Sequence, residues 1–109
     1  MPTAYKVLGQ VNPSATTATT LYTVGAGKSA VVSTIAVCNQ AATSATFRIA
    51  VRVAGSALSA EEYIAYDSTV AANDTTMLTI GITLAATDVI TVYASSANVS
   101  FNAFGSEIS

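Results

Sequence analysis

Residues 46–53 read TFRIAVRV, and the alternation within this stretch decides the fold class. Every second residue is apolar and lies on the same side of an extended chain: Phe47, Ile49, Val51 and Val53. Arg48, Ala50 and Arg52 take the opposite side. A period of two residues is typical of a β-strand that buries one face and exposes the other. The stretch therefore predicts a strand at the edge of a hydrophobic core.

The same period recurs along the chain, and no segment has the period of an amphipathic helix. Further strands are expected at residues 4–11, 20–24, 29–39, 62–67, 77–84, 89–94 and 98–104. Within residues 77–84 the inward side chains are expected to be Leu78, Ile80, Ile82 and Leu84. Turn signals separate the strands, so we expect one all-β domain over residues 1–109, an antiparallel β-sandwich or jelly roll of about eight strands. One helical turn is expected in residues 56–62, where Ser59 and Glu62 have the spacing of a capping box.

Residues 29–39, SAVVSTIAVCN, are apolar on both sides of the expected strand. One side is expected to carry Val31, Ile35 and Val37, and the other Ala30, Val32, Ala36 and Cys38. Either both sides are covered within the chain, or the outer side meets another chain, which makes Val32 and Ala36 candidate interface residues. Only 9% of the residues are charged, against about 25% in a typical soluble domain. A charge-poor surface favours association, and we expect a homotrimer.

The composition argues against an enzyme. The chain has no histidine, and Cys38 lies in an apolar strand without a basic neighbour, so it is expected to be structural. Glu61 and Glu62 are adjacent and would point to opposite sides of an extended chain, so they are poorly placed to act as an acid/base pair on one substrate bond. The spacing of Asp67, Asn73 and Asp74 matches no calcium loop. We therefore expect no catalytic residue, no metal site and no cofactor.

Residues 24–29, VGAGKS, end like a phosphate-binding P-loop. That motif needs a glycine five residues before Gly27, where this chain has Tyr22, and it needs a following helix, where this chain has a strand pattern. We interpret the stretch as a tight turn between strands. The net charge is −2, with no basic run, so nucleic acid is not an expected partner. No apolar run reaches the length of a membrane span, and the N-terminus lacks an apolar signal core, so we expect synthesis in the cytoplasm.

Two groups of surface residues remain open to more than one interpretation. Arg48 and Arg52 share one side of their strand and form either a docking patch or a solvated face. Four tyrosines are either sandwich-edge and interface residues, Tyr63 and Tyr66 above all, or a platform on which a sugar stacks: Tyr22, Tyr63, Tyr66 and Tyr93.

Several short motifs, in the order in which they occur here, resemble a group of small virion proteins from tailed bacteriophages, notably phages of cyanobacteria and marine bacteria. Residues 23–28, TVGAGK, correspond to a TVPAGK turn in that group, and the strand VVSTIAVCN corresponds to VVSSIVVCN. FRIAVRVAG is similar to YRIAVRPAG, and the ending LAATDVITVYAS…NVSFNAFG recurs. The resemblance runs from about Tyr5 to Gly105, and the two departures are Gly25 and Val53, where the group has proline.

The resemblance implies a non-enzymatic virion structural protein with a β-sandwich fold. Together with the charge-poor surface, it leads us to expect a capsid decoration (cement) protein that binds the major capsid protein or another virion protein and stabilises the assembled head. The alternative is a tail, baseplate or fibre component that contacts host-surface glycans. A free carbohydrate-binding module is a third hypothesis, from a different class.

Overall fold

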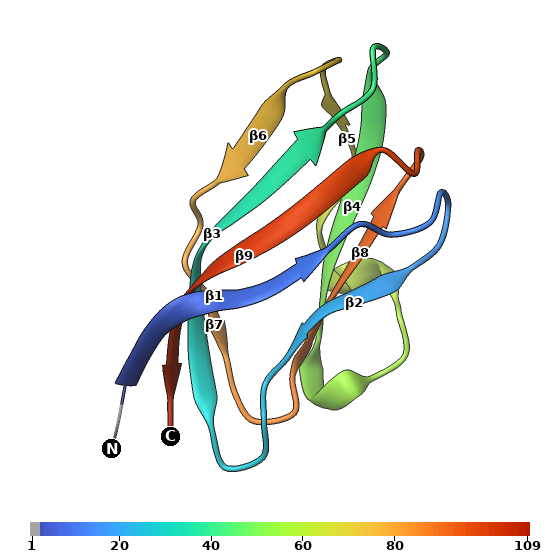
Figure 1. The fold of residues 1–109 in the computed structure, drawn as a ribbon. Coiled ribbons are helices and arrows are strands. Elements are labelled where there is room, and N and C mark those ends of the chain that lie inside the picture. Colours follow the sequence, from blue (N-terminus) through green and yellow to red (C-terminus); the bar gives the residue numbers. More distant parts are fainter. Residues whose placement is uncertain (1–2) are drawn as a thin grey trace.

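The computed structural model describes residues 3–109, which form one compact all-β domain of two antiparallel sheets packed face to face (Figure 1). Sheet A contains, in spatial order, β1 (Thr3–Val11), β9 (Val99–Ile108), β3 (Ser29–Asn39) and β6 (Thr75–Leu78), and β7 (Ile82–Leu84) also pairs with β3. Sheet B contains β2 (Thr19–Thr23), β8 (Val89–Ala94), β4 (Ala45–Arg52) and β5 (Tyr63–Val70). The predicted β-sandwich is confirmed.

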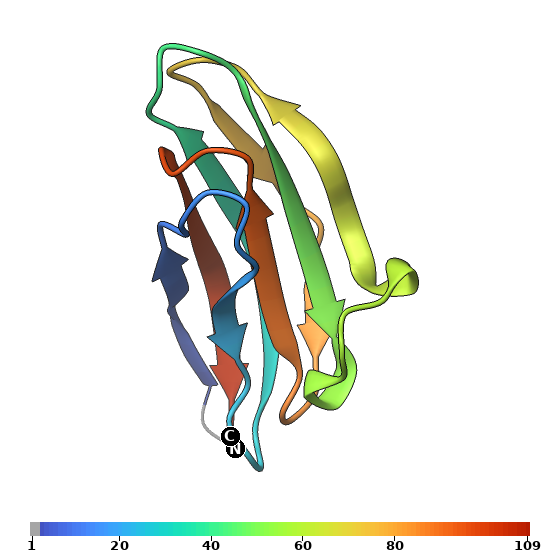
Figure 2. The ribbon, with the colours of Figure 1, turned by 90° about the vertical axis from the view of Figure 1, so that its right-hand side faces the viewer.

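The pairing is strongly non-local. The first strand pairs with the last, so that Thr3 lies opposite Ile108 at one end of the sandwich (Figure 1). The segment between β4 and β5 forms two short 3-10 helices, η1 (Val53–Gly55) and η2 (Ala60–Glu62). Figure 2 shows this segment projecting on the side of β5, away from β1.

The core lies between the sheets and is built from alternate residues of the central strands. Phe47 from sheet B meets Phe101 from sheet A edge-on, with ring centroids 6.3 Å apart. The other large side chains that are fully buried are aliphatic: Ile35, Ile49, Leu84, Ile90, Val24, Val32, Val37, Val70, Val92 and Val99. Burial of each such side chain contributes about 1.5–3 kcal/mol relative to leaving it in water.

The alternation predicted for residues 29–39 is wrong at one point. The pairing of β3 with β9 shifts between Val32 and Thr34, so Ser33 is an extra residue in a β-bulge. The bulge reverses which residues face the core, and Val32 is fully buried while Val31 faces outward. Val32 therefore belongs to the core and not to an outer interface, which corrects the expectation from strict alternation.

The single strand predicted at residues 77–84 is two strands. β7 pairs with residues 30–32 of β3 and β6 pairs with residues 35–38, so the interruption at residues 79–81 lies opposite the β3 bulge. Gly81 supplies the left-handed backbone in the interruption, with φ of 60°. Leu84 is buried as predicted, but Ile80 is 51% exposed instead of inward, because it lies outside the ladder.

The predicted helical turn in residues 56–62 is confirmed as η2. The Glu62 carboxylate accepts a hydrogen bond from the Ser59 backbone N–H at 2.9 Å, which is the backward half of a capping box. Within residues 3–109 no helix is long and apolar enough to cross a membrane.

Candidate interaction surfaces

The outer side of sheet A carries a row of apolar side chains that we call the sheet-A face: Tyr5, Val7, Val31, Ala36, Met77 and Phe104. Register brings them together, because Val7 lies opposite Phe104 and Ala36 lies opposite Met77. Tyr5, Val7 and Met77 are 85%, 48% and 58% exposed. Of the sequence-predicted interface residues, Ala36 alone lies on this face.

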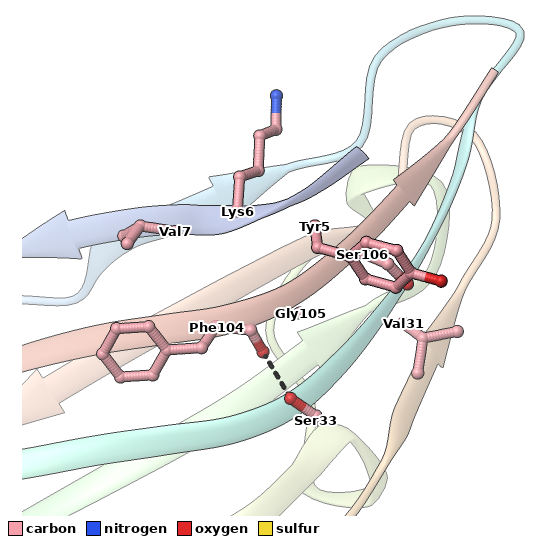
Figure 3. A pocket seen from close by; sticks show the side chains of 8 residues that line it. All are labelled: Tyr5, Lys6, Val7, Val31, Ser33, Phe104, Gly105 and Ser106. Carbon is pink, nitrogen blue, oxygen red and sulfur yellow. Dashed lines mark hydrogen bonds between the residues drawn. The ribbon is translucent and has the colours of Figure 1, made fainter. Parts of the chain in front are cut away.

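A shallow cavity of 440 Å³ opens in the sheet-A face, lined chiefly by Tyr5, Val31, Ser33 and Phe104 (Figure 3). The Ser33 hydroxyl donates to the Phe104 carbonyl at 3.1 Å, so the bulge satisfies its own polar side chain. Lys6 extends away from Tyr5 and Val31 in Figure 3 and reaches the opposite side of β1. The cavity is therefore largely apolar, and the charged residue in its lining, Lys6, is paired with Glu107.

Apart from Lys6, which lines the cavity, the charged residues of the chain lie away from the sheet-A face. The chain has four basic and six acidic residues, all within the described part. Six lie on sheet B or its loops: Arg48, Arg52, Glu61, Glu62, Asp67 and Asp88. Lys6 and Lys28 both pair with Glu107, and Asp74 lies in the turn before β6. Cys38, opposite Thr75 and Ser100, is partly exposed on this side and carries no charged neighbour in the ladder.

The outer side of sheet B carries a cluster of aromatic and charged residues, which we call the tyrosine–arginine cluster: Arg48, Tyr63, Tyr66, Asp67 and Tyr93. The Arg48 guanidinium lies over the rings of Tyr66 and Tyr93, 4.2 and 4.3 Å from their centroids. Its Nε and Nη2 donate to the two Asp67 oxygens at 2.7 and 3.3 Å. Tyr63 and Tyr66 meet edge-on, with centroids 5.0 Å apart.

Local backbone geometry builds this cluster. The pairing of β4 with β5 shifts between Phe47 and Ile49, and Asp67 has a left-handed φ of 51°. Aspartate adopts that conformation more readily than most residues. The irregularity directs both Tyr66 and Asp67 toward Arg48. The hydrogen bond that Arg48 donates to Asp67 is the main reason that the pKa of Arg48 is raised above its usual value.

Arg52 is held in a different way. Its Nε and Nη2 donate to the backbone carbonyls of Ser56 and Gly55 at 2.6 and 2.9 Å. Arg52 thus fastens the η1 turn to sheet B. The sequence left open whether Arg48 and Arg52 form a docking patch or a solvated face, and the structure places both guanidinium groups in hydrogen bonds within the chain.

Tyr22 does not join the other tyrosines. It is buried at the end of the sandwich, and its hydroxyl donates to Glu107 Oε2 at 2.7 Å. Lys6 and Lys28 approach Glu107 Oε1 at 3.0 and 3.5 Å. The Tyr22 hydrogen bond first, and the lysines after it, lower the pKa of Glu107 to about 2. Burial, and then Glu107, raises the pKa of Tyr22. Sequence reasoning missed this network because its members lie far apart in the chain.

The turn interpretation of VGAGKS is confirmed. Residues 24–28 connect β2 to β3, Gly27 has a left-handed φ of 74°, and the Lys28 N–H donates to the Gly25 carbonyl at 3.2 Å. Lys28 forms an ion pair with Glu107. Of the residues considered for calcium, Asp67 is held by Arg48, while Asn73 and Asp74 lie in the turn before β6. Within residues 3–109 no group of three or more histidine, cysteine, aspartate or glutamate side chains is placed to hold a metal.

No protein-family model, curated protein or solved structure matches this chain. The geometry of the two outer sheet faces is therefore the basis for a functional assignment. The sheet-A face is apolar and uncharged, and the sheet-B side holds the tyrosine–arginine cluster.

Proposed function

We propose that this protein is a non-enzymatic structural protein of a phage virion, a capsid decoration protein that binds the major capsid protein or another virion protein on the assembled head. The structural observation that supports the proposal is the sheet-A face, where the exposed side chains of Tyr5, Val7 and Met77 suit burial against another subunit of the same particle. The motifs between Tyr5 and Gly105 that resemble tailed-phage virion proteins support the same proposal.

The physical argument is that the sheet-A face can be buried in an interface at a low desolvation cost. Interface centres are depleted of charged residues and enriched in aromatic residues and methionine. Burial of this face removes apolar surface from water and desolvates no ion, so it gains about 25 cal/mol per Å² without the penalty of stripping a charge. We propose that the sheet-A faces of three copies pack together in a closed homotrimer, which ends growth at a defined size.

The strand order also supports a role in a virus particle. If β6 and β7 count as one interrupted strand, the chain has two four-stranded sheets, and β9 and β8 each insert between earlier strands. We infer from this order that the sandwich is a jelly roll, a fold found in capsid and lectin domains. The fold analogy supports the proposal without deciding it, because one fold serves many functions.

The proposed mechanism is stabilisation by mass action. A protein that binds the assembled shell but not its separated subunits shifts the equilibrium toward the shell, by about 2.7 kcal/mol per site at a free concentration one hundred times its Kd. Because many copies bind one head, their contributions to the stability of the shell add together. Such a role needs a small, stable domain and no catalytic group.

The test is to add purified protein to heads that were assembled without it. We expect saturable binding, measured by co-sedimentation, and a higher temperature at which the heads release their DNA. Binding to isolated tails but not to heads would replace the proposal with its alternative, a tail, baseplate or fibre component. Binding to neither would reject both.

A further inference from the structure

A second cavity lies on the other side of the molecule. It has a volume of 590 Å³ and is lined by Leu58, Ser59, Ala60, Tyr63 and Tyr66, which come from η2, the residues before it, and β5. Small-ligand sites are usually about 300–1,000 Å³ and are lined by apolar and aromatic groups with a few polar ones. The cavity meets that description and is separate from the sheet-A face.

Two tyrosine rings form a corner in this cavity. The rings of Tyr63 and Tyr66 are nearly perpendicular, at 89°, with centroids 5.0 Å apart. Arg48 lies against the Tyr66 ring, and Asp67 fixes Arg48. The Tyr66 ring is thus held in place before any ligand arrives. A rigid aromatic surface loses little conformational entropy on binding.

The ionised groups around the cavity already have partners. Arg48 pairs with Asp67, and Glu62 accepts hydrogen bonds from the Ser59 N–H and the Ser56 hydroxyl. Glu61 accepts from the Ser59 hydroxyl at 2.7 Å. An anionic ligand would therefore meet two carboxylates that no cation within residues 3–109 neutralises, and the nearby guanidinium of Arg48 is already paired with Asp67. The carboxylates still have free lone pairs, so they can accept further hydrogen bonds from neutral hydroxyl groups.

We propose that this cavity binds one neutral sugar ring of a glycan. A pyranose has an apolar C–H face, which suits a tyrosine ring, and hydroxyl groups around its edge. The hydroxyls of Ser59, Tyr63 and Tyr66, which all line the cavity, supply hydrogen-bond partners for that edge. The assignment does not rest on the head-decoration proposal, because the cavity is equally available on a head, on a tail or on a free protein.

The test begins with the full-length protein on an array of neutral and acidic glycans, followed by NMR titration with the neutral sugars glucose, galactose and mannose at millimolar concentration. We expect capture of neutral glycans and shift changes confined to residues 58–66. Tyr66→Ala should weaken binding at least tenfold. Ile64→Ala is the matched control, since Ile64 is exposed on the same strand but does not line the cavity.

Two further variants keep the test valid if Tyr66→Ala fails to fold. Tyr66→Phe retains the ring against Arg48 and should bind within a few-fold of the original protein. Ala60→Leu leaves both tyrosines in the chain but places a larger side chain in the cavity lining, and it should abolish binding. The proposal is overturned if no neutral glycan binds, if Ala60→Leu has no effect, or if the shift changes map elsewhere. Shift changes in residues 58–66 produced only by a virion protein would also overturn it, in favour of a protein-binding pocket.

Discussion

Gly105 has no β-carbon, and this allows the bulge in β3 to pack against β9. A Cβ added at Gly105 would overlap the Val31 carbonyl oxygen, which is part of the backbone and cannot rotate away. Gly105→Ala should therefore destabilise the fold by about 1–3 kcal/mol, the usual cost of overpacking. Urea unfolding measures the change. Gly25→Ala is the control, because its nearest new neighbour is the end of the flexible Lys28 side chain at 3.4 Å, and it should change stability little.

Equal effects of Gly105→Ala and Gly25→Ala would contradict the close approach of β9 to Val31. The comparison separates a steric effect at the bulge from the general effect of replacing a glycine, which also restricts the unfolded chain.

Glu107 makes the folding stability of the sandwich depend on pH in the acidic range. Its pKa is about 2 in the folded protein, against an ordinary value of 4.5. A lowered pKa means that the folded state holds fewer protons than the unfolded state. The stabilisation is therefore complete above about pH 4.5 and is lost as the pH falls toward 2. We expect the thermal midpoint of Glu107→Gln to fall less steeply across this range than that of the original protein.

The measurement is the thermal midpoint at closely spaced pH values from 2 to 6, for both proteins in the same salt. Parallel curves would show that the contacts of Glu107 with Tyr22 and the lysines do not contribute to folding stability in solution. High salt should weaken the difference, since the Lys28 side chain is partly solvated.

The strands themselves were predictable, but their register was not. The period of two located the strands to within a few residues, except that it merged β6 and β7, because apolar and polar residues alternate in strands such as β4 and β9. The sequence pattern does not reveal the bulge at Ser33, because SAVVSTIAVCN is apolar on both sides of the strand. Its cause is the fit to neighbouring strands, where Gly105 and Gly81 allow the irregular backbone.

The side chain of Arg52 makes two of the hydrogen bonds that hold the η1–η2 segment. Arg52 donates to the carbonyls of Gly55 and Ser56, which have no strand partner. Arg52→Ala should release residues 53–62, and hydrogen exchange measured by mass spectrometry should become faster there while β9 exchanges as before. Unchanged exchange in residues 53–62 would mean that the segment is held by its other contacts, such as the Asp88 carboxylate with the Ala54 N–H.

The candidate site was only partly predictable, because sequence reasoning could not assign strands to faces. Tyr66 meets both Arg48 and Tyr63, which the sequence did not predict, whereas Ala36 lies on the opposite side of the molecule and Val32 lies in the core. The separation depends on which strands share a sheet, and that depends on pairings such as β1 with β9 that no local pattern reveals.

Self-association through the sheet-A face predicts a specific effect of charge. Val7→Lys places an ammonium beside Phe104, where burial would strip its hydration. We expect the original protein to have a mass near three times the 11.0 kDa of one chain by light scattering, and Val7→Lys to be a monomer. Ile64→Lys is the matched control, because Ile64 on β5 is 46% exposed and Val7 is 48% exposed. A monomeric original protein, or dissociation by both substitutions, would contradict the assignment of this face.

The most direct test of the proposed function is electron cryo-microscopy of intact particles. The proposal predicts density for this sandwich on the outer surface of the head, in closed groups of three copies with their sheet-A faces packed against one another. Density for this protein on the tail alone, or a head that carries it with the sheet-A face open to solvent, would contradict the proposal.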